Sequence, residues 1–193
     1  LIGANWVNQS GADASVTGSY ATGSVTAAAS WVGGLVGFNQ INTAGINAKA
    51  NILNSYATGA VSHPAAASGN AAAGIGGLVG INRNQASSGS ATVVSSYATG
   101  TVTGTTLANA YGTGGLIGFN VASASGANNS VSNSYATGVV SGQFNVGGLI
   151  GQNNSEKGGQ ANIDSSYATG TVTTLSGGTG GLVGSNKADT ANA

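Results

Sequence analysis

The chain has 193 residues, the length of one domain or of one domain with a small companion. Only four residues are basic and four are acidic, which argues against binding to nucleic acid or to an anionic membrane surface. Cysteine is absent, so disulfides and thiolate metal sites are excluded, and no apolar run reaches the length of a membrane-spanning segment.

Two short motifs recur along the chain. The pentapeptide Ser-Tyr-Ala-Thr-Gly occurs five times, starting at Ser19, Ser55, Ser96, Ser134 and Ser166. The motif Gly-Gly-Leu-(Val/Ile)-Gly also occurs five times, starting at Gly33, Gly76, Gly114, Gly147 and Gly180. Successive pentapeptides are 32–41 residues apart, and the variation is confined to two loops. Constant motifs with insertions at two fixed places predict rigid strands joined by tolerant corners.

Each repeat has the pattern of short strands. Ile52 stands four residues before Tyr56, and the equivalent spacing holds in every repeat, which predicts a half-buried strand with both side chains facing the core. Val61 follows Tyr56 by five residues and has the opposite parity, so the chain must turn between them. Thr58-Gly59 is the expected corner, because glycine accepts the positive φ of a tight bend.

These elements predict an all-β fold, a right-handed parallel β-helix or β-solenoid. We expect about one coil of three strands per 32–41-residue repeat, and the alternative is two smaller coils per repeat. A separation of about 4.8 Å between the Cα atoms of Tyr56 and Tyr97 would indicate one coil per repeat, and about 9.6 Å would indicate two. Residues 1–193 are expected to form a single solenoid domain of about five repeats. Because the chain starts in mid-repeat, we expect it to be a fragment of a longer protein.

Equivalent residues of successive coils are expected to stack into ladders. The aromatic ladder comprises Tyr20, Tyr56, Tyr97, Tyr135 and Tyr167. The aliphatic ladder comprises Leu35, Leu78, Leu116, Leu149 and Leu182. The amide ladder comprises Asn39, Asn82, Asn120, Asn153 and Asn186. We expect the Asn side chains to brace a corner by bonding to the coils above and below, and the paired glycines to lie where coils approach closely.

The sequence contains few side chains of the types that act in catalysis. His63 is the only histidine and has no carboxylate near it in sequence, so we interpret it as a loop residue without a chemical role. The acidic residues fall at different phases of the repeat and predict neither a paired-carboxylate site nor a metal site; they are Asp13, Glu156, Asp164 and Asp189. The glycine-rich run 74–80 lacks the following helix of a phosphate-binding loop. We therefore expect no enzyme, cofactor or metal.

Aromatic residues and hydroxyl rows are the candidate contact features. The Tyr ladder could be a platform for sugar rings, but its parity favours a stacked row in the core. Off the ladder, aromatic residues near the variable segments suit either glycan contact or packing over corners, and we favour packing; they are Trp6, Trp31, Phe38, Tyr111, Phe119 and Phe144. Two rows of hydroxyl residues are expected to face solvent, one running from Thr22 to Thr169 and one from Thr26 to Thr173.

The run from Asn54 to Gly59, followed by Gly76-Gly77-Leu78-Val79-Gly80, resembles the GLUG repeat. GLUG repeats occur in large secreted and surface proteins of bacteria, including filamentous-haemagglutinin-like adhesins. The resemblance implies a β-solenoid in an extracellular adhesin and carries over no catalytic residue. Two departures are the long loop 60–75 and the replacement of an apolar residue by Thr113 and Thr179 before the paired glycines.

The expected function is a structural and adhesive segment of a secreted or cell-surface bacterial protein, a rigid stalk that mediates attachment or biofilm-matrix contacts. Its expected partners are a polysaccharide or a host or cell-surface protein, bound by many weak contacts through faces and loops such as 60–75 and 101–113. The alternatives are a fibre subunit that associates end to end, an ice-binding solenoid, and a β-helix enzyme that degrades polysaccharide.

Overall fold

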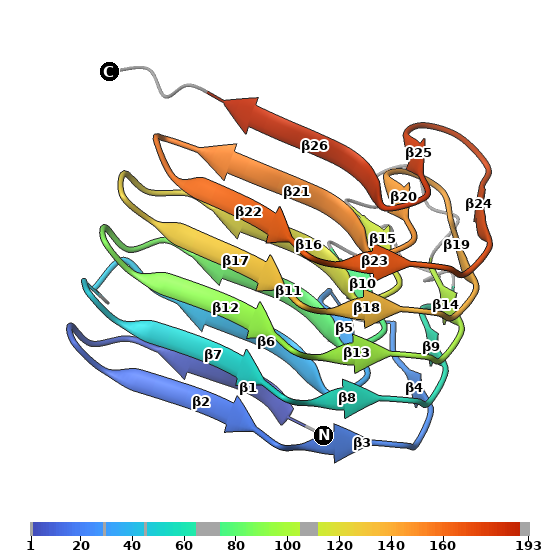
Figure 1. The fold of residues 1–193 in the computed structure, drawn as a ribbon, viewed down its shortest axis with the longest axis horizontal. Helices are drawn as coiled ribbons and strands as arrows, with labels where there is room; N and C mark the ends of the chain where they lie inside the picture. Colours follow the sequence, from blue (N-terminus) through green and yellow to red (C-terminus); the bar gives the residue numbers. More distant parts are fainter. Residues whose placement is uncertain (1, 29, 45, 65–73, 105–111, 190–193) are drawn as a thin grey trace.

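The computed structural model describes residues 2–28, 30–44, 46–64, 74–104 and 112–189. Within these ranges the chain is all β-structure, with parallel strands wound into a β-solenoid of about five turns. In Figure 1 the chain runs one way along the front of the molecule and returns behind it while it climbs from the N-terminus, so the coil is right-handed. No helix in the described residues is long and apolar enough to cross a membrane.

Two sheets of longer strands form one side of the solenoid. Sheet A has six strands, β1 (Ile2–Val7), β6 (Val36–Ile41), β11 (Val79–Asn84), β16 (Ile117–Ala122), β21 (Ile150–Glu156) and β26 (Val183–Asp189). Sheet B has five strands, β2 (Asp13–Thr17), β7 (Lys49–Leu53), β12 (Ser90–Val94), β17 (Asn128–Ser132) and β22 (Gln160–Asp164).

Three sheets of very short strands form the other side. Sheet C consists of β3 (Tyr20–Ala21), β8 (Tyr56–Ala57), β13 (Tyr97–Ala98), β18 (Tyr135–Ala136) and β23 (Tyr167–Ala168). Sheet D consists of β4 (Val25–Thr26), β9 (Val61–Ser62), β14 (Val102–Thr103), β19 (Val140–Gly142) and β24 (Val172–Thr174). Sheet E consists of β5 (Val32–Gly33), β10 (Ile75–Gly76), β15 (Thr113–Gly114), β20 (Val146–Gly147) and β25 (Thr179–Gly180).

One repeat makes one coil. Tyr56 and Tyr97 are direct register partners in sheet C, and their ring centroids are 4.8 Å apart, so the alternative of two coils per repeat is wrong. The coil has five strand segments rather than the expected three. The difference arises because the Tyr-Ala, Val-(Thr/Ser) and (Val/Ile/Thr)-Gly pairs each form separate two- or three-residue strands between bends, too short for hydrophobic alternation to reveal.

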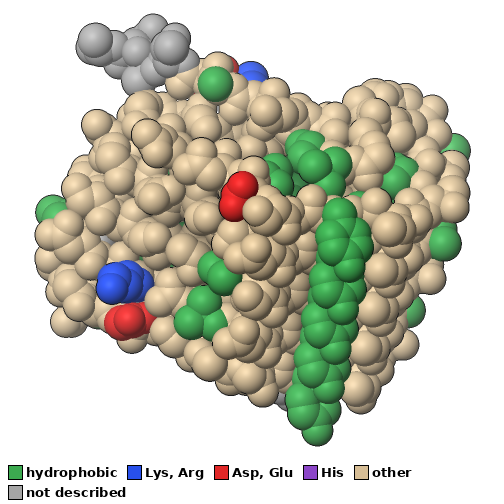
Figure 2. All heavy atoms as spheres, viewed as in Figure 1, with side chains coloured by type: hydrophobic (Ala, Val, Ile, Leu, Met, Phe, Trp, Pro, Cys, Tyr) green, Lys and Arg blue, Asp and Glu red, His purple; other side chains and the backbone are tan. Residues whose placement is uncertain are grey.

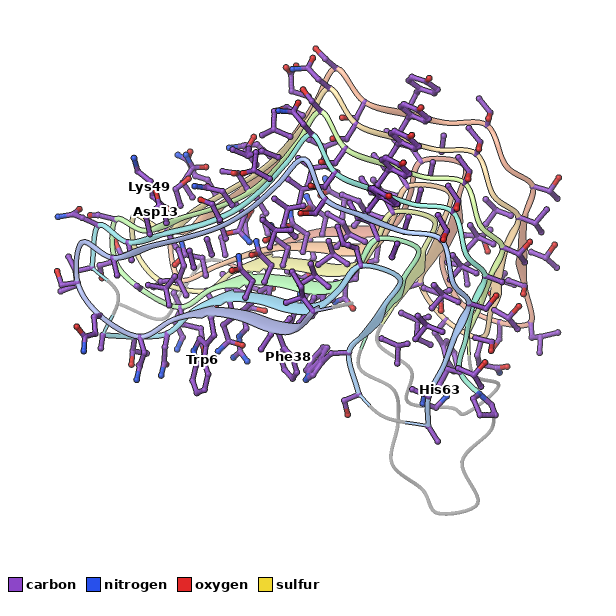
Figure 3. All side chains as sticks on the ribbon, turned by 90° about the horizontal axis from the view of Figure 1, so that it is seen from below. Trp6, Asp13, Phe38, Lys49 and His63 are labelled. Atoms are coloured by element: carbon purple, nitrogen blue, oxygen red, sulfur yellow. The ribbon has the colours of Figure 1, made fainter. Side chains whose placement is uncertain are left out.

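The core runs through the whole length of the solenoid in three parts. Viewed along the axis in Figure 3, sheets A and B face each other as two layers, and sheets C, D and E enclose a wider lobe. The central core contains Leu35, Ile52 and their equivalents in the other coils. A second cluster of valines and Ile75 fills the lobe. A third, richer in alanine, fills the narrow end around Ile41.

The bend between sheets B and C depends on a left-handed residue. It precedes each Ser-Tyr-Ala-Thr-Gly motif, and the positions are Gly18, Asn54, Ser95, Asn133 and Ser165, with φ between 45° and 58°. The chain also changes sheet at Thr-Gly, as expected, but Gly59 has no positive φ. Gly59 is required there because a Cβ would lie 2.0 Å from the carbonyl oxygen of Gly23 in the coil below.

Candidate functional site

The Tyr ladder lies on the outside of the solenoid, over sheet C. Each ring stacks on that of the next coil, with centroids 4.8–5.2 Å apart and planes within 8° of parallel. The end rings of Tyr20 and Tyr167 are 57% and 53% exposed. Figure 2 shows the ladder as one continuous stripe on the surface. The prediction that these side chains face the core is therefore wrong.

Two features of the coil put the Tyr outside. The left-handed residue Asn54 stands between Ile52 and Tyr56, so the inward alternation of sheet B does not continue into sheet C. The interior also has no room for a ring at this level. A Cβ added to Gly77 would lie 2.9 Å from the Cβ of Ala98, so only the alanine of Tyr-Ala-Thr fits inside.

The stacking limits what the ladder can bind. Each inner ring has both faces covered by its neighbours, so mainly ring edges and hydroxyl groups meet solvent. A sugar that stacks on an aromatic residue needs an open ring face. Within the described coils, an open ring face is therefore present only at Tyr20 and Tyr167. The rest of the ladder forms a rigid stripe that presents ring edges and hydroxyl groups to solvent.

The Asn ladder lies inside the solenoid and joins sheets A and B. In coil after coil an amide Nδ2 donates to the Oδ1 of the next Asn at 2.7–2.8 Å. The same group also donates across the core, as Asn39 does to the carbonyl oxygen of Ala50 at 2.9 Å. These residues sit in the middle of the sheet A strands, so their predicted place at a corner is wrong. The ladder is a buried, hydrogen-bonded seam.

The Leu ladder and the paired glycines are core elements. Leu35, Leu78, Leu116 and Leu149 are fully buried, while Leu182 is 38% exposed. The second glycine of a pair allows two coils to touch, because a Cβ on Gly77 would lie 2.1 Å from the carbonyl oxygen of Gly115. Strand β11, and no helix, follows the glycine-rich run, so this run lacks the geometry of a phosphate-binding loop.

His63 is buried at the end of β9, and neither ring nitrogen has a hydrogen-bond partner in the described part of the chain. It is labelled in Figure 3, in the lobe. The described residues contain no group of three or more His, Cys, Asp or Glu side chains that could hold a metal ion. Tyr111 and most of the loops 60–75 and 101–113 lie outside the described residues.

The hydroxyl rows flank sheets C and D on the outside. One row follows the Tyr ladder, and all five of its members are exposed, namely Thr22, Thr58, Thr99, Thr137 and Thr169. The other row alternates in exposure, and its first two members, Thr26 and Ser62, are hydrogen-bonded to each other at 2.9 Å. Between them runs an exposed row of mixed chemistry, Ser24, Ala60, Thr101, Val139 and Thr171.

The outer face of sheet A carries tryptophan, phenylalanine and charged side chains. Phe38, Ile81 and Phe119 are outward register neighbours in successive coils. Trp31 reaches over them from the bend before β5, with its ring centroid 6.1 Å from that of Phe38 and 6.4 Å from that of Phe119. Trp31 has a φ of 62°, a strained conformation for a bulky residue.

An aromatic groove opens beside this cluster. It has a volume of about 310 Å3 and is lined by Ala4, Trp6, Phe38 and Gln40. The indole of Trp6 is 59% exposed, and Figure 3 shows Trp6 and Phe38 both projecting outward from sheet A. Packing of Trp31 against Phe38 holds one wall of the groove in place. This site has an open aromatic face, which the inner rings of the Tyr ladder lack.

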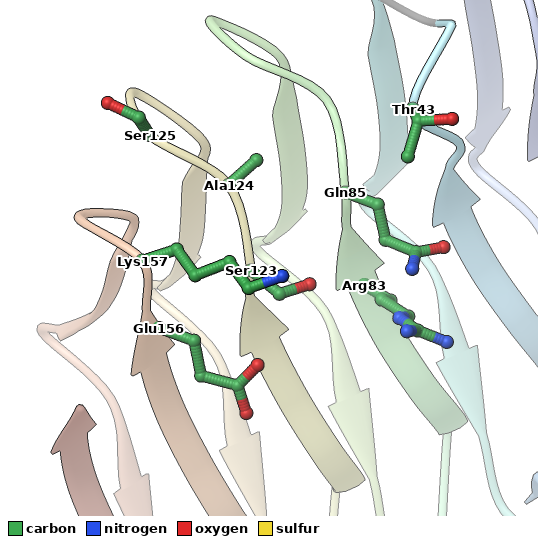
Figure 4. A pocket seen from close by; sticks show the side chains of 8 residues that line it. All are labelled: Thr43, Arg83, Gln85, Ser123, Ala124, Ser125, Glu156 and Lys157. Atoms are coloured by element: carbon green, nitrogen blue, oxygen red, sulfur yellow. The ribbon is translucent and has the colours of Figure 1, made fainter. Parts of the chain in front are cut away.

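A polar groove of about 670 Å3 lies farther along the same side, at the ends of the sheet A strands (Figure 4). Its lining is Thr43, Arg83, Gln85, Ser123, Ala124, Ser125, Glu156 and Lys157. Partial burial lowers the pKa of Arg83, and the negative charge of Glu156 raises it to a lesser degree. Arg83 makes no hydrogen bond or ion pair with another described residue, whereas Lys187 pairs with Asp189 at 2.7 Å.

Comparison with known families identifies one segment of the chain. Residues 142–173 match the GLUG motif. No curated protein and no solved structure matches the chain. The matched segment runs from the end of β19 to β24 and contains one copy of each repeated motif, so it corresponds to one coil. The GLUG motif and the β-solenoid fold together indicate a structural repeat protein.

The two grooves were missed as sites at the sequence level, although the GLUG-type motif contains a usable signal. One residue varies between the constant Gly and Asn of Gly-Gly-Leu-(Val/Ile)-Gly-x-Asn. Five residue types occupy its six positions, which are Ala4, Phe38, Ile81, Phe119, Gln152 and Ser185. The residue after the Asn varies as well, and it includes Trp6, Gln40 and Arg83. Variation at two positions next to constant ones marks the outward side chains of sheet A.

Proposed function

We propose that this chain is a structural and adhesive segment of a secreted or cell-surface bacterial protein, a rigid stalk whose outer faces make attachment contacts. The observation that carries the proposal is the one-to-one register of successive coils, with the Asn ladder inside and the Tyr ladder outside. Such a stack transmits position and force along its axis with little bending, which suits a spacer.

The surface chemistry supports attachment rather than catalysis. Exposed Thr and Ser rows and amide side chains offer many weak hydrogen bonds, and repetition along the axis multiplies them into avidity. The few charges leave no strong field that would favour nucleic acid. A polysaccharide or a cell-surface protein fits such a surface, and the matched GLUG motif is consistent with a repeat segment of a larger surface protein.

Attachment can be tested by coupling the chain to beads and washing them over surfaces coated with polysaccharides or with extracellular-matrix and cell-surface proteins. We expect retention on at least one polysaccharide or protein surface, and retention should rise steeply with the density of the coupled chain. Beads that carry a heat-unfolded sample serve as the control. Equal retention of folded and unfolded beads, or no retention on any surface, would contradict the proposal.

A second candidate function, ice binding, has one specific observation in its favour. The five Thr residues from Thr22 to Thr169 are all exposed in one column beside the Tyr ladder. The adjacent row mixes Ser, Ala, Thr and Val, which disrupts the regular hydroxyl lattice that an ice surface requires. A measurement of thermal hysteresis separates the two candidates, and we expect none.

A further inference from the structure

The outer side of sheet A brings charged side chains and an exposed indole close together. The whole sequence has four basic and four acidic residues, yet Arg83, Glu156 and Lys157 all line the polar groove. The most exposed Trp of the chain, Trp6, lines the aromatic groove on the same side. The two grooves are therefore the places to look for a ligand.

The two grooves are adjacent. Gln40 lines the aromatic groove and Gln85 lines the polar groove, and the amide Nε2 of Gln40 donates to the Oε1 of Gln85 at 3.1 Å. Trp6, Gln40 and Arg83 are also register neighbours in three successive coils. Since coils are spaced by ~4.8 Å, the backbone positions of Trp6 and Arg83 lie about 10 Å apart along the solenoid axis.

The aromatic groove has the chemistry to hold the apolar face of a sugar ring. Its walls are the exposed indole of Trp6 and the phenyl ring of Phe38, and Gln40 at its edge can exchange hydrogen bonds with hydroxyl groups. Trp31 packs against Phe38 at the expense of a left-handed backbone. Strain held in this way at a surface feature points to a functional role.

The polar groove has the chemistry to hold a carboxylate. Arg83 is half-buried and has no hydrogen-bonding or ionic partner among the described residues, and its planar guanidinium matches a carboxylate with two parallel hydrogen bonds. Lys157 adds a second positive charge on the far side of the groove. Glu156 lines the same groove and accepts a hydrogen bond from the Nδ2 of Asn154 at 3.3 Å, so one negative charge stands beside the two positive ones.

We propose that the outer side of sheet A binds an acidic polysaccharide built of carboxylated sugars, lying along the solenoid axis. One sugar ring stacks in the aromatic groove between Trp6 and Phe38, and the carboxylate of a nearby sugar pairs with Arg83. Lys157 attracts the polymer, and the serine and glutamine side chains of the polar groove bond its hydroxyl groups. This inference rests on the proposed attachment function and names its ligand class and its site.

The test measures binding of the chain to defined oligomers of polygalacturonate by calorimetry. We expect binding that weakens as salt is raised. Arg83→Gln should lower the affinity by roughly 10- to 100-fold, because a charge-assisted hydrogen bond to the ligand is lost. Trp6→Ala should lower it by about tenfold and abolish the change in tryptophan fluorescence on binding. Glu156→Gln should raise it by about twofold, since a like charge is removed.

Matched controls separate this site from general electrostatic attraction. Lys49→Gln removes one positive charge from the exposed side of sheet B and should leave the affinity unchanged. Urea unfolding of each variant checks that the solenoid is intact. Equal loss in Lys49→Gln and Arg83→Gln, equal binding of neutral dextran oligomers, or tighter binding of sulfated heparin oligomers would each overturn the proposal of a carboxylate site.

The bead assay distinguishes failure of this site from failure of the attachment function. If beads carrying Trp6→Ala and Arg83→Gln are retained as well as wild-type beads, attachment stands and the sheet A site is wrong. If wild-type beads are retained on no surface but the oligomers still bind in solution with the expected variant effects, the site stands and the attachment function is wrong. If the wild-type chain binds no polygalacturonate oligomer, the site is wrong.

Discussion

The Asn and Tyr ladders are both single residues repeated in every coil, yet they do opposite things. Asn82 is fully buried, donates to Asn120 and to the carbonyl oxygen of Ala91, and accepts from Asn39. The side chain of Tyr97 lies at the surface and stacks on the rings of the two neighbouring coils, whose centroids are 4.8 and 4.9 Å away. The polar residue is inside and the aromatic residue is outside, the reverse of the usual preference.

The comparison shows that, in a solenoid, the contacts and hydrogen bonds that a residue needs can be supplied by the equivalent residues of the neighbouring coils. A buried amide is tolerated because the next Asn and the facing strand take up its hydrogen bonds. An exposed phenol is tolerated because the rings above and below cover its apolar faces. The burial of the Asn and the exposure of the Tyr are therefore set by stacking of the coils and not by the usual preference of each residue type.

The largest expected effect on stability comes from filling the narrow interior that excludes the Tyr ring. Gly77→Ala puts a Cβ 2.1 Å from a backbone oxygen of the next coil and 2.9 Å from the Cβ of Ala98. Because backbone must move to relieve this overlap, we expect a loss of about 3 kcal/mol or more in the free energy of unfolding. Urea denaturation measures it.

Gly181→Ala is the matched control, since Gly181 occupies the same motif position between β25 and β26 in the last coil, and no atom of the described residues lies within 4 Å of an added Cβ. It should change the stability by less than about 1 kcal/mol. Similar losses for Gly77→Ala and Gly181→Ala would show that close approach of the coils does not decide what fits inside.

The next effect concerns the Asn ladder. Asn82→Leu keeps the side-chain volume but leaves the amide of Asn39 and the carbonyl oxygen of Ala91 without their partner. We expect a loss of about 2–4 kcal/mol in urea unfolding, from buried polar groups left unsatisfied. Asn186→Leu, at an exposed position of the same ladder, should cost much less. A neutral or stabilising Asn82→Leu would mean that the seam is dispensable.

The Tyr ladder should tolerate truncation better. Tyr97→Ala removes two stacked ring pairs and no buried hydrogen bond, so we expect a loss of about 1–2 kcal/mol. Circular dichroism of the aromatic bands should weaken at the same time. If Tyr97→Ala destabilises the chain more than Asn82→Leu, the contrast drawn between the two ladders is incorrect.

The smallest effect is a dependence on alkaline pH. Burial between its neighbours, followed by the negative charges that Tyr97 and Tyr167 acquire, raises the pKa of Tyr135 above its usual value of 10.0. The folded state therefore favours the neutral phenol. This stabilisation is fully present below pH 10.0 and is lost as the pH rises through the folded-state pKa.

The unfolding midpoint should fall more between about pH 9 and about pH 12 in the wild-type chain than in Tyr135→Phe. Tyrosinate absorbance, followed during the same titration, should rise later in the folded chain than in urea. An earlier rise in the folded chain would contradict a raised pKa in the ladder.

Much of the fold is predictable from the sequence, because equivalent residues of successive repeats become neighbours when the coils stack. Five copies with fixed phase indicated a right-handed parallel β-solenoid and the stacking of Tyr on Tyr, Leu on Leu and Asn on Asn. The paired glycines predict close approach of the coils, and the contacts of Gly77 confirm it. Less of the candidate site is predictable. The sequence marks Trp6, Phe38 and Trp31 as residues for glycan contact or for packing, with packing favoured, and it does not single out Arg83. Trp31 packs on Phe38, whereas Trp6 is exposed.

The sequence by itself determined the period, the ladders and the all-β fold, since these depend on spacing along the chain. Only the tertiary structure decided which side of the wall each ladder faces. One left-handed residue before each Ser-Tyr-Ala-Thr-Gly reverses the alternation, and the thin interior between Gly77 and Ala98 excludes a ring. The tertiary structure also decided the grooves of sheet A, because Trp6, Gln40 and Arg83 come from three successive coils and become neighbours only when the coils stack.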